Sequence, residues 1–491
     1  MRKRWVAGKG RRRAALWMLV MVGALFLGTP LVVQEVEGDQ ATERDRIEAL
    51  EQELTELRAE IERLKRATPQ AGEPAPAPDD GRLAELERRI EVLAEEIEKL
   101  TLGEAAAQAD RGDFGLGPAA SKVYRTGEGL SVGGYGELLY ENFDSSRDDG
   151  APSGRTDRFD LLRGVLYFGY KWNDRWLLNS EIEYEHGSTG SGGEVSVEFA
   201  YVDYLWRPAL GLRAGLLLVP MGFLNELHEP TVFLGARRPG VETAIIPTAW
   251  RENGLGVFGE AGAVTWRAYV VNGLDAADFT AGGLRGGRQK GAQAKAEDFA
   301  LVGRLDWRPV PGVLVGGSAY FGDSGQGLRR PSRPEDQDEG VPPPRGQLDV
   351  GTRILEAHAE WRWQGLEVRG LLARAELDEV AELNAALGLA GSASVGEEME
   401  GWYAQLGYDV FSRWGRGEQS LTPYLRWEEM DTQAAVPSGF RAGAANDVET
   451  LTLGVAYQPI ASVILKIDHQ DFENGAGTGV DQFNVLLGYT F

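Results

Sequence analysis

The sequence predicts an all-β transmembrane barrel of about sixteen antiparallel strands, preceded by a short α-helical coiled coil. Three observations carry this prediction. From about residue 130, apolar side chains recur at every second position, as in a strand with one face against an apolar medium. The connections between these strands alternate in length along the chain. Before residue 103, apolar side chains recur instead about every 3.5 residues, which is typical of a coiled coil.

Residues 1–33 have the composition of an export signal. The basic segment MRKRWVAGKGRRR precedes the apolar segment AALWMLVMVGALFLG, in the order of a secretory signal peptide. No small-x-small cleavage site stands out, and the apolar run continues through Val33. We therefore expect a signal peptide whose cleavage site is undetermined. The alternative is an uncleaved inner-membrane anchor, because about 20 apolar residues can span a bilayer.

Residues 41–67 predict a coiled coil with an uninterrupted apolar seam. At alternating spacings of three and four, the seam contains Ile47, Leu50, Leu54, Leu57, Ile61 and Leu64. The flanking pairs are opposite in charge: Arg46–Glu51, Glu53–Arg58 and Glu60–Lys65. Such pairs face each other across helices in a parallel assembly, so the pattern favours a parallel homo-oligomer. The alternative is an amphipathic helix that packs on its own domain.

A Pro/Ala-rich linker at 68–81 interrupts the seam, because proline cannot continue a helix interior. A second coiled-coil segment is expected at 82–102, with the apolar positions Leu83, Leu86, Ile90, Leu93, Ile97 and Leu100. The two segments are one position out of phase and are therefore separate pieces. Each has fewer than three heptads, which is short for a stable isolated helix. Residues 103–129 are expected to be a linker to the barrel at 130–491.

The sixteen expected strands are 130–141, 159–171, 175–186, 194–206, 212–222, 254–260, 263–271, 299–307, 313–321, 350–363, 366–376, 399–411, 420–430, 449–457, 462–472 and 480–491. Several alternate cleanly between apolar and polar residues. LLRGVLYFGY places on one face Leu162, Leu166, Phe168 and Tyr170. The final stretch QFNVLLGYTF places on one face Phe483, Val485, Leu487, Tyr489 and Phe491. One face of each such strand is expected to contact lipid.

The connections alternate between long, Gly- and Asp-rich segments and short turns such as WND, AG and QG. An outer-membrane barrel has short periplasmic turns, longer extracellular loops and an even number of strands. A soluble β-sandwich or propeller, the alternative, has no reason to sort its loops in this way. We therefore expect the chain in the cell outer membrane, with outer-membrane lipid around the barrel and the coiled coil in the periplasm.

Charge and composition exclude several classes of function. The formal net charge of −24 argues against nucleic acid as a partner, because phosphate neutralisation needs basic surface. The absence of cysteine excludes disulfides, cysteine-ligated metals and thiol catalysis. The four histidines lie in different parts of the chain, without a nucleophile motif or a metal-ligand cluster: His186, His228, His358 and His469. We expect neither an enzyme nor a cofactor.

The strand face opposite the lipid carries charges of both signs, which predicts a water-filled lumen in the size class of sixteen strands. The cationic pore-lining candidates on this face are Arg163, Arg213, Arg267, Arg304 and Arg426. The alternative is that these charges pair with acids on the same face, such as Asp306, Glu428 and Asp468, and serve only solvation.

The segment 223–253 is too apolar for a loop in water, so we expect it to fold into the barrel and pack on its interior. It would bring seven charged or titratable candidates for a constriction: Glu226, His228, Glu229, Arg237, Arg238, Glu242 and Arg251. Rings of charge control which ions pass a pore. The alternative is a subunit-contact loop that latches onto a neighbouring barrel.

The closing NVLLGYTF resembles the terminal recognition strand of bacterial outer-membrane proteins, which typically ends in Phe. The stretch LLLVPMGFLNELHEP…RRPGVETAIIPTAWRENGLGVFGE is similar to the phosphate-selective porin O and P family. The resemblance covers most of 130–491 and implies a trimeric porin with an anion path of lysines and arginines. It also implies that the barrel-insertion machinery reads the C-terminal signal, carried by Phe483, Val485, Leu487, Tyr489 and Phe491. The lumen-facing charges include many acids and one lysine, so phosphate binding is not carried over.

These observations together predict a homotrimeric porin, a water-filled channel for passive diffusion of ions and small hydrophilic solutes, with a lean toward small anions. The alternative function is a structural envelope tether, in which the coiled coil links the outer membrane to the peptidoglycan of the cell wall.

Overall fold

The computed structural model describes residues 36–66, 114–190, 192–331, 346–413 and 419–491, together with residues 82, 85, 86, 88–90, 92–94 and 96. The chain divides into two compact units, Met1–Leu100 and Thr101–Phe491. The expected signal peptide, the Pro/Ala-rich linker and residues 103–113 lie outside the described residues.

In the first unit, α2 (Val36–Arg66) includes most of the first predicted coiled-coil segment. Described residues of the second segment are also helical. Arg46 pairs with Glu96 at 2.7 Å, and Arg82 pairs with Glu60 at 2.6 Å, so the second segment runs antiparallel to α2. Among the described side chains of this unit, Leu54, Ile61 and Leu86 are apolar and buried. The chain thus covers part of its seam by folding back on itself, and the parallel oligomer stays a prediction.

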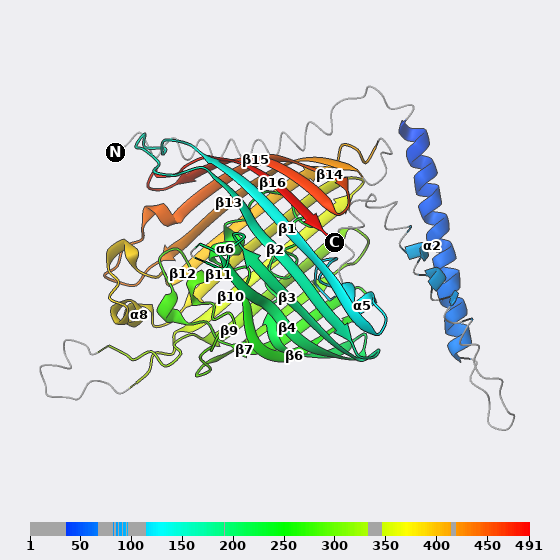
Figure 1. Ribbon diagram of the computed structural model, residues 1–491, viewed down its shortest axis with the longest axis horizontal. Helices are drawn as coiled ribbons and strands as arrows, with labels where there is room; N and C mark the ends of the chain where they lie inside the picture. Colours follow the sequence, from blue (N-terminus) through cyan, green and yellow to red (C-terminus); the bar gives the residue numbers. More distant parts are fainter. Residues whose placement is uncertain are drawn as a thin grey trace, which may run out of the picture. The chain divides into compact units, whose positions relative to one another are not determined.

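The second unit is a closed barrel in which all sixteen expected strands are present, each paired antiparallel with its neighbours in the sequence (Figure 1). Its first half contains β1 (Gly129–Phe143), β2 (Arg158–Lys171), β3 (Trp176–Glu185), β4 (Glu194–Arg207), β5 (Leu210–Leu218), β6 (Arg251–Ala261), β7 (Val264–Asn272) and β8 (Phe299–Trp307). Its second half contains β9 (Val313–Asp323), β10 (Gly351–Trp363), β11 (Leu366–Leu377), β12 (Glu398–Tyr408), β13 (Ser420–Ala435), β14 (Asp447–Ile460), β15 (Val463–Asn474) and β16 (Gln482–Thr490).

The short helices of this unit lie outside the strands. They are α5 (Lys122–Arg125), α6 (Val241–Ala244), α8 (Val380–Ala386), η1 (Ala276–Asp278), η2 (Arg285–Gly287), η3 (Gly391–Ala393) and η4 (Ala444–Asn446). Because consecutive strands are antiparallel, their connections alternate between the two ends of the barrel. The longest, 219–250, 273–298 and 324–350, share one end. The opposite end has two-residue turns at 208–209, 262–263, 364–365 and 461–462, although its connection 409–419 is longer than the loop 475–481.

The barrel closes where the last strand meets the first. Tyr135 of β1 is opposite Thr490 of β16, and the register continues without interruption to Phe143 opposite Gln482. Beyond β16, Phe491 and Gly134 exchange two backbone hydrogen bonds of 2.9 and 3.0 Å. No edge strand is left at this seam, which removes the unpaired backbone groups that an apolar medium would penalise.

Alternation along the strands places apolar side chains on the outside of the barrel, as expected. The final strand is an example: Phe483, Leu487, Tyr489 and Phe491 are exposed there, and Asn484 and Leu486 are buried on the inner face. The lumen-facing parity is likewise confirmed for charged residues such as Arg213 and Asp306, which are buried.

Among the register irregularities of the barrel, β-bulges in β2 and β4 shift this alternation. In β2, Glu137 is opposite Arg163 while Leu138 is opposite Leu161, so Leu162 is the extra residue. A bulge changes which face the following side chains occupy. Leu162 packs inside the barrel against the buried cluster of Leu139, Ala236 and Leu486. The prediction that it shares the outer face of Leu166, Phe168 and Tyr170 is therefore wrong. A second bulge in β4 turns Glu198 inward.

Residues 114–126, here called the inner segment, are ordered and packed inside the barrel. Leu116, Ala120 and Val123 are buried. Val123 packs so closely on Gly169 of β2 that a Cβ atom added to Gly169 would lie only 2.5 Å from the Cβ of Val123. The expectation that 103–129 is a linker is wrong for this segment. Its apolar residues are few and closely spaced, too short a run to show a period, so the sequence pattern did not predict it.

Candidate functional site

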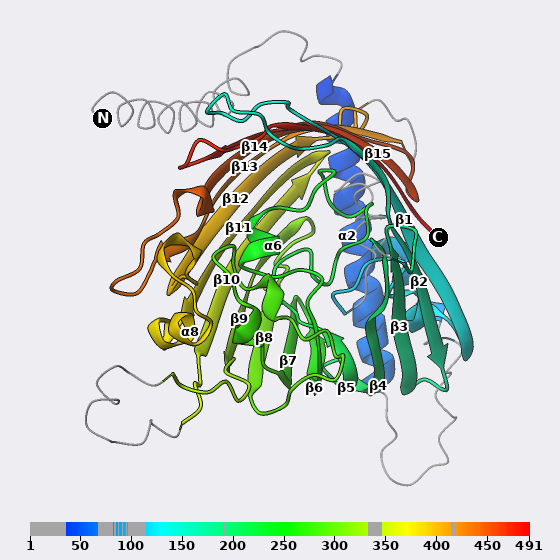
Figure 2. The same cartoon turned by 60° about the vertical axis from the view of Figure 1, so that its left-hand side comes forward.

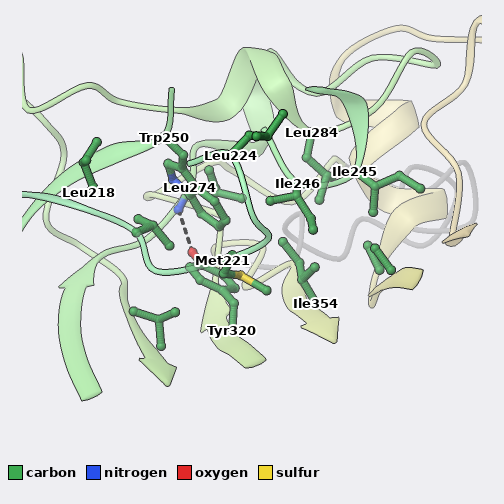
Figure 3. Close-up of a cluster of buried hydrophobic side chains, with 14 of the residues drawn as sticks. Leu218, Met221, Leu224, Ile245, Ile246, Trp250, Leu274, Leu284, Tyr320 and Ile354 are labelled. Atoms are coloured by element: carbon green, nitrogen blue, oxygen red, sulfur yellow. Dashed lines mark hydrogen bonds between the residues drawn. The ribbon is translucent and has the colours of Figure 1, made fainter. Parts of the chain in front are cut away.

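Residues 219–250, here called the inner loop, fold into the barrel as expected. They form a core with the wall that includes Leu224, Ile245, Ile246 and Trp250 from the loop, Leu274 and Leu284 from the β7–β8 loop, and Tyr320 and Ile354 from the strands (Figure 3). Figure 3 also shows Leu274 donating its backbone N–H to the hydroxyl of Tyr320, at 3.1 Å. Burial of this apolar surface drives the loop inward.

Polar side chains fix the two ends of the inner loop. Asn225 donates its side-chain amide to the carbonyl oxygens of Val219 and Trp250, at 2.6 and 2.8 Å, and accepts the N–H of Trp250 at 2.6 Å. Glu242 accepts the N–H of Leu224 at 2.8 Å and the hydroxyl of Tyr403 at 2.7 Å. These bonds satisfy buried backbone groups that a loop lacks secondary structure to satisfy.

A group of buried charges anchors the start of the inner loop to β7, β8 and β10. Asp306 pairs with Arg304 at 2.8 Å and with Arg267 at 3.3 Å, and its Oδ1 lies 2.9 Å from Nε2 of His358. Arg304 also donates to the carbonyl oxygen of Gly222, and Arg267 pairs with Glu226 at 3.1 Å. Each of these charges has an opposite partner, as burial requires.

The far side of the inner loop is fixed to β13 and β15 by wall charges that bond its backbone. Lys466 donates to the carbonyl oxygen of Gly235 at 3.0 Å, and Asp468 accepts the N–H of Ala236 at 2.7 Å. Glu428 accepts the N–H of Gly240, at 2.6 Å, while pairing with Arg426 at 2.7 Å. The loop therefore crosses the lumen from β5 to the opposite wall (Figure 2).

The inner segment contacts both the inner loop and the wall. Glu229 accepts the backbone N–H groups of Ala119 and Ala120, at 3.0 and 2.9 Å. Tyr124 donates to Asp203 at 2.7 Å and accepts from Arg213, which itself pairs with Asp203 at 2.9 Å. Three parts of the chain that are far apart in sequence thus share one buried network.

An open cavity of about 490 Å³ lies beside the inner loop. Five arginines line it: Arg155, Arg163, Arg237, Arg238 and Arg285. Against them stand two acids, Glu137 and Glu428. The lining of the cavity therefore carries more cationic than anionic groups, although the whole chain is strongly acidic.

The five arginines differ in how far their charge is neutralised. Arg163 pairs with Glu137 at 2.7 Å, and Arg237 with Glu141 at 2.5 Å. Arg155 lies over the ring of Phe143 at 5.3 Å. The pKa of Arg285 is lowered mainly by partial burial of its side chain, and the nearby positive charges of Arg238 and Arg163 lower it further.

Arg238 is one of three arginines in this group, with Arg155 and Arg285, that make no ion pair among the described residues. Its Nη2 is buried and has no hydrogen-bond partner among the described residues. An unsatisfied buried donor of this kind costs free energy unless a water molecule or an ion completes it.

The twelve predicted pore-lining residues fall into two groups. Arg163, Arg237 and Arg238 line the cavity. The remaining nine are buried in contacts that hold the inner loop, the inner segment or the wall together: Glu226, His228, Glu229, Glu242, Arg251, Arg213, Arg267, Arg304 and Arg426. Of these, Arg251 pairs with Glu198 at 2.6 Å, and His228 Nε2 lies 3.1 Å from Glu181. The alternative that wall charges pair with one another describes most of them.

Sequence reasoning missed Arg155 and Arg285, which reach the cavity from the β1–β2 and β7–β8 loops. Both stand in Gly- and Asp-rich stretches that read as solvated loops, and no local signal separates them from other loop arginines. Glu198 was also missed, because the bulge in β4 breaks the alternation on which the prediction relied.

The outer face of the barrel is apolar over its middle and aromatic at one end. Exposed leucines there include Leu212, Leu255, Leu301 and Leu372. Six tryptophans that are 45–57% exposed lie at the end with the two-residue turns: Trp172, Trp176, Trp206, Trp307, Trp361 and Trp363. An aromatic belt of this kind is typical of a membrane–water interface. Among the described residues, no helix has both the length and the apolar composition needed to cross a bilayer.

The chain is similar to an uncharacterized protein of Aquifex aeolicus (strain VF5), with 36% identity over 382 residues that cover 76% of this chain and 82% of that protein. Each of three solved structures covers 74% of this chain. OmpF of Salmonella typhi in complex with daunomycin has 11% identity, a TM-score of 0.47 and 98% of its own chain covered. The outer membrane channel DcaP of Acinetobacter baumannii has 12% identity, a TM-score of 0.45 and 97% of its own chain covered. An anion-selective porin from Comamonas acidovorans has 12% identity, a TM-score of 0.42 and 99% of its own chain covered.

No family model matches the chain, so the resemblance to the phosphate-selective porin O and P family stays a prediction. The likeness to the Aquifex aeolicus protein extends over most of both sequences. The chain belongs to the same family as that protein.

Proposed function

We propose that this protein is a channel of the cell outer membrane, through which small hydrophilic solutes, with a preference for anions, diffuse passively. The apolar outer face and the tryptophan belt support placement in a bilayer. The closed barrel satisfies its backbone hydrogen bonds between strands, as a structure in hydrocarbon must.

The observation that carries the proposed anion preference is the cavity beside the inner loop, with its five arginines and two glutamates. Charges that line a narrow passage act through low-dielectric walls, which concentrates ions of the opposite sign. Most other lumen charges are paired, as Arg304 is with Asp306, and contribute little net field. The selectivity would therefore depend on a few arginines rather than on the whole wall.

The test is conductance of the full chain in planar bilayers under a potassium chloride gradient. We expect stepwise conductance and a zero-current potential on the anion side. Replacing Arg238 and Arg285 together, as Arg238→Ala with Arg285→Ala, should lower the chloride-to-potassium permeability ratio. One charge acting at about 4 Å through water contributes on the order of 1 kcal/mol, roughly a fivefold change.

The matched control is Arg353→Ala, because Arg353 lies on the outer face of β10 and is about half exposed. It should leave the permeability ratio unchanged. Absence of any conductance would contradict the channel itself, whereas conductance with an unshifted ratio in the double variant would contradict the role of the cavity arginines.

The proposed partners follow from this function. A homotrimer would give conductance steps in threes, and the barrel-insertion machinery would read the C-terminal strand that ends at Phe491. The tether remains the second candidate, since the first unit folds as a separate helical piece. Co-sedimentation of the full chain with peptidoglycan sacculi tests the tether. A chain that lacks residues 36–100 is the control and should not co-sediment.

A further inference from the structure

The cavity beside the inner loop is not lined by charge alone. Eight apolar residues also line it: Phe143, Leu162, Phe233, Ala236, Met430, Val448, Phe472 and Val480. A passage for small inorganic ions has no need of three phenylalanine rings, since such ions gain nothing from apolar contact. This mixture of guanidinium and apolar groups points to a ligand that contains both kinds of surface.

The two kinds of side chain come from different parts of the barrel. Phe143, Met430, Val448 and Phe472 belong to β1, β13, β14 and β15, and only β16 separates β15 from β1 in the barrel. Arg237, Arg238 and Arg285 belong to the inner loop and the β7–β8 loop. A contiguous arc of wall therefore supplies most of the apolar surface, and the loops that enter the lumen supply most of the charge.

The size of the cavity suits an organic molecule. Its volume of about 490 Å³ exceeds the roughly 150 Å³ that holds one benzene ring in an apolar cavity, so a ring and a carboxylate fit together. Arg155 already lies over the ring of Phe143 at 5.3 Å, which shows that aromatic and cationic groups approach each other here.

We infer that this cavity binds small organic anions, in which a carboxylate is attached to an apolar or aromatic body, in preference to inorganic phosphate. Arg238 is the anchor for the carboxylate, because it lines the cavity and makes no ion pair among the described residues. The apolar body lies against Phe472 and its neighbours on the wall. This inference rests on the proposed channel function and names the class of solute that the channel admits.

The test is equilibrium binding to the detergent-solubilised full chain, measured by isothermal titration calorimetry at constant ionic strength. The probes are benzoate, cyclohexanecarboxylate, inorganic phosphate and benzylammonium. We expect both carboxylates to bind at least about tenfold more tightly than phosphate, because removing one ring face from water contributes an effect of this order. Benzylammonium, which has the same ring with the opposite charge, should not bind.

Two variants separate the two parts of the site. Arg238→Ala should weaken benzoate and cyclohexanecarboxylate alike by roughly tenfold, the order expected for a lost charge-assisted hydrogen bond. Phe472→Ala should weaken both carboxylates by several-fold and leave phosphate unchanged. The exterior substitution Arg353→Ala is the control for both. Full-length circular dichroism identifies a variant that fails to fold.

Comparison of the four probes on the unaltered chain needs no variant, so the inference stays testable in any case. Equal affinity for phosphate and benzoate would overturn it. So would benzoate binding that neither Arg238→Ala nor Phe472→Ala weakens. A chain that conducts anions but shows no preference for the carboxylates retains the proposed function and loses only this inference. Carboxylate binding without any conductance retains the binding site and contradicts the proposed channel.

Discussion

Two sets of charged side chains lie inside this barrel, and they differ in what surrounds them. Around the inner loop, arginines are paired at short range: Arg304 with Asp306, Arg426 with Glu428, and Arg213 with Asp203. Beside it, the cavity holds five arginines against two glutamates, and the buried Nη2 of Arg238 has no hydrogen-bond partner in the part of the chain that the structure describes. Both sets would look alike in a list of lumen-facing residues.

The difference indicates a division of labour within one lumen. The paired charges bond backbone groups of the inner loop, as Arg304 bonds Gly222 and Lys466 bonds Gly235, and they fix the loop where its apolar core already holds it. Of the cavity arginines, Arg163 and Arg237 pair with acids and Arg285 donates to the carbonyl oxygen of Thr248 in the inner loop. Arg155 and Arg238 make no ion pair among the described residues, and their charge is the most available to a solute. The two sets should therefore respond in opposite ways to substitution, the first in stability and the second in selectivity.

The largest effect is expected for Asp306→Ala. Asp306 neutralises Arg304 and Arg267 and lies 2.9 Å from His358, so its removal leaves two buried cations without this partner. Breaking a buried pair costs about 3–5 kcal/mol in the free energy of unfolding. Urea unfolding of the chain in lipid vesicles, followed by tryptophan fluorescence, measures this loss.

The exterior pair of Arg353 with Glu376 sharpens that result. It is about half exposed, with a nitrogen–oxygen distance of 3.4 Å. Arg353→Ala should change the free energy of unfolding by less than about 1 kcal/mol. Similar losses for Asp306→Ala and Arg353→Ala would mean that the buried network does not hold the barrel interior together.

A smaller effect is expected for Glu229→Ala, which acts on the junction between the inner loop and the inner segment. Two backbone N–H groups, of Ala119 and Ala120, lose their acceptor. Leaving buried donors unsatisfied costs about 1–3 kcal/mol. Amide hydrogen exchange should quicken across residues 114–126 and stay unchanged in the strands. Glu229→Gln keeps an acceptor oxygen and should show a smaller change; equal exchange in both variants would exclude this junction as the anchor.

The barrel wall could be predicted from the sequence because each strand has an apolar outer face and a polar inner face, which impose a period of two on the chain. Each expected strand is present, and the outward position of Phe483 and Leu487 follows from alternation alone. The exceptions are local. The bulges in β2 and β4 insert one residue and turn Leu162 and Glu198 inward. Each bulge lies near a strand end, so only a few residues beyond it show the shifted alternation, too few to be recognised in the sequence.

The lumen could be predicted only in part, because pairing depends on which loops enter it. Alternation placed Arg304 and Arg426 on the inner face, yet it carries no information on whether an acid or water faces them. The apolar composition of the inner loop predicted its inward course. The inner segment and Arg285 depend on contacts between parts of the chain that are far apart in sequence, which no local pattern records.

The smallest effect on stability is expected for Arg238→Ala, the substitution with the largest proposed effect on the solute. Its Nη2 has no hydrogen-bond partner in the described part of the chain, and its charge repels that of Arg285, so its loss removes repulsion and an unsatisfied donor. The free energy of unfolding should stay within about 0.5 kcal/mol or rise slightly, as for other positions without stabilising contacts. Urea unfolding under the conditions used for Asp306→Ala measures it. A loss above about 2 kcal/mol in the free energy of unfolding would show that Arg238 stabilises the fold. It would then belong with the structural charges, because a side chain kept for solute binding is expected to contribute little to stability or to reduce it.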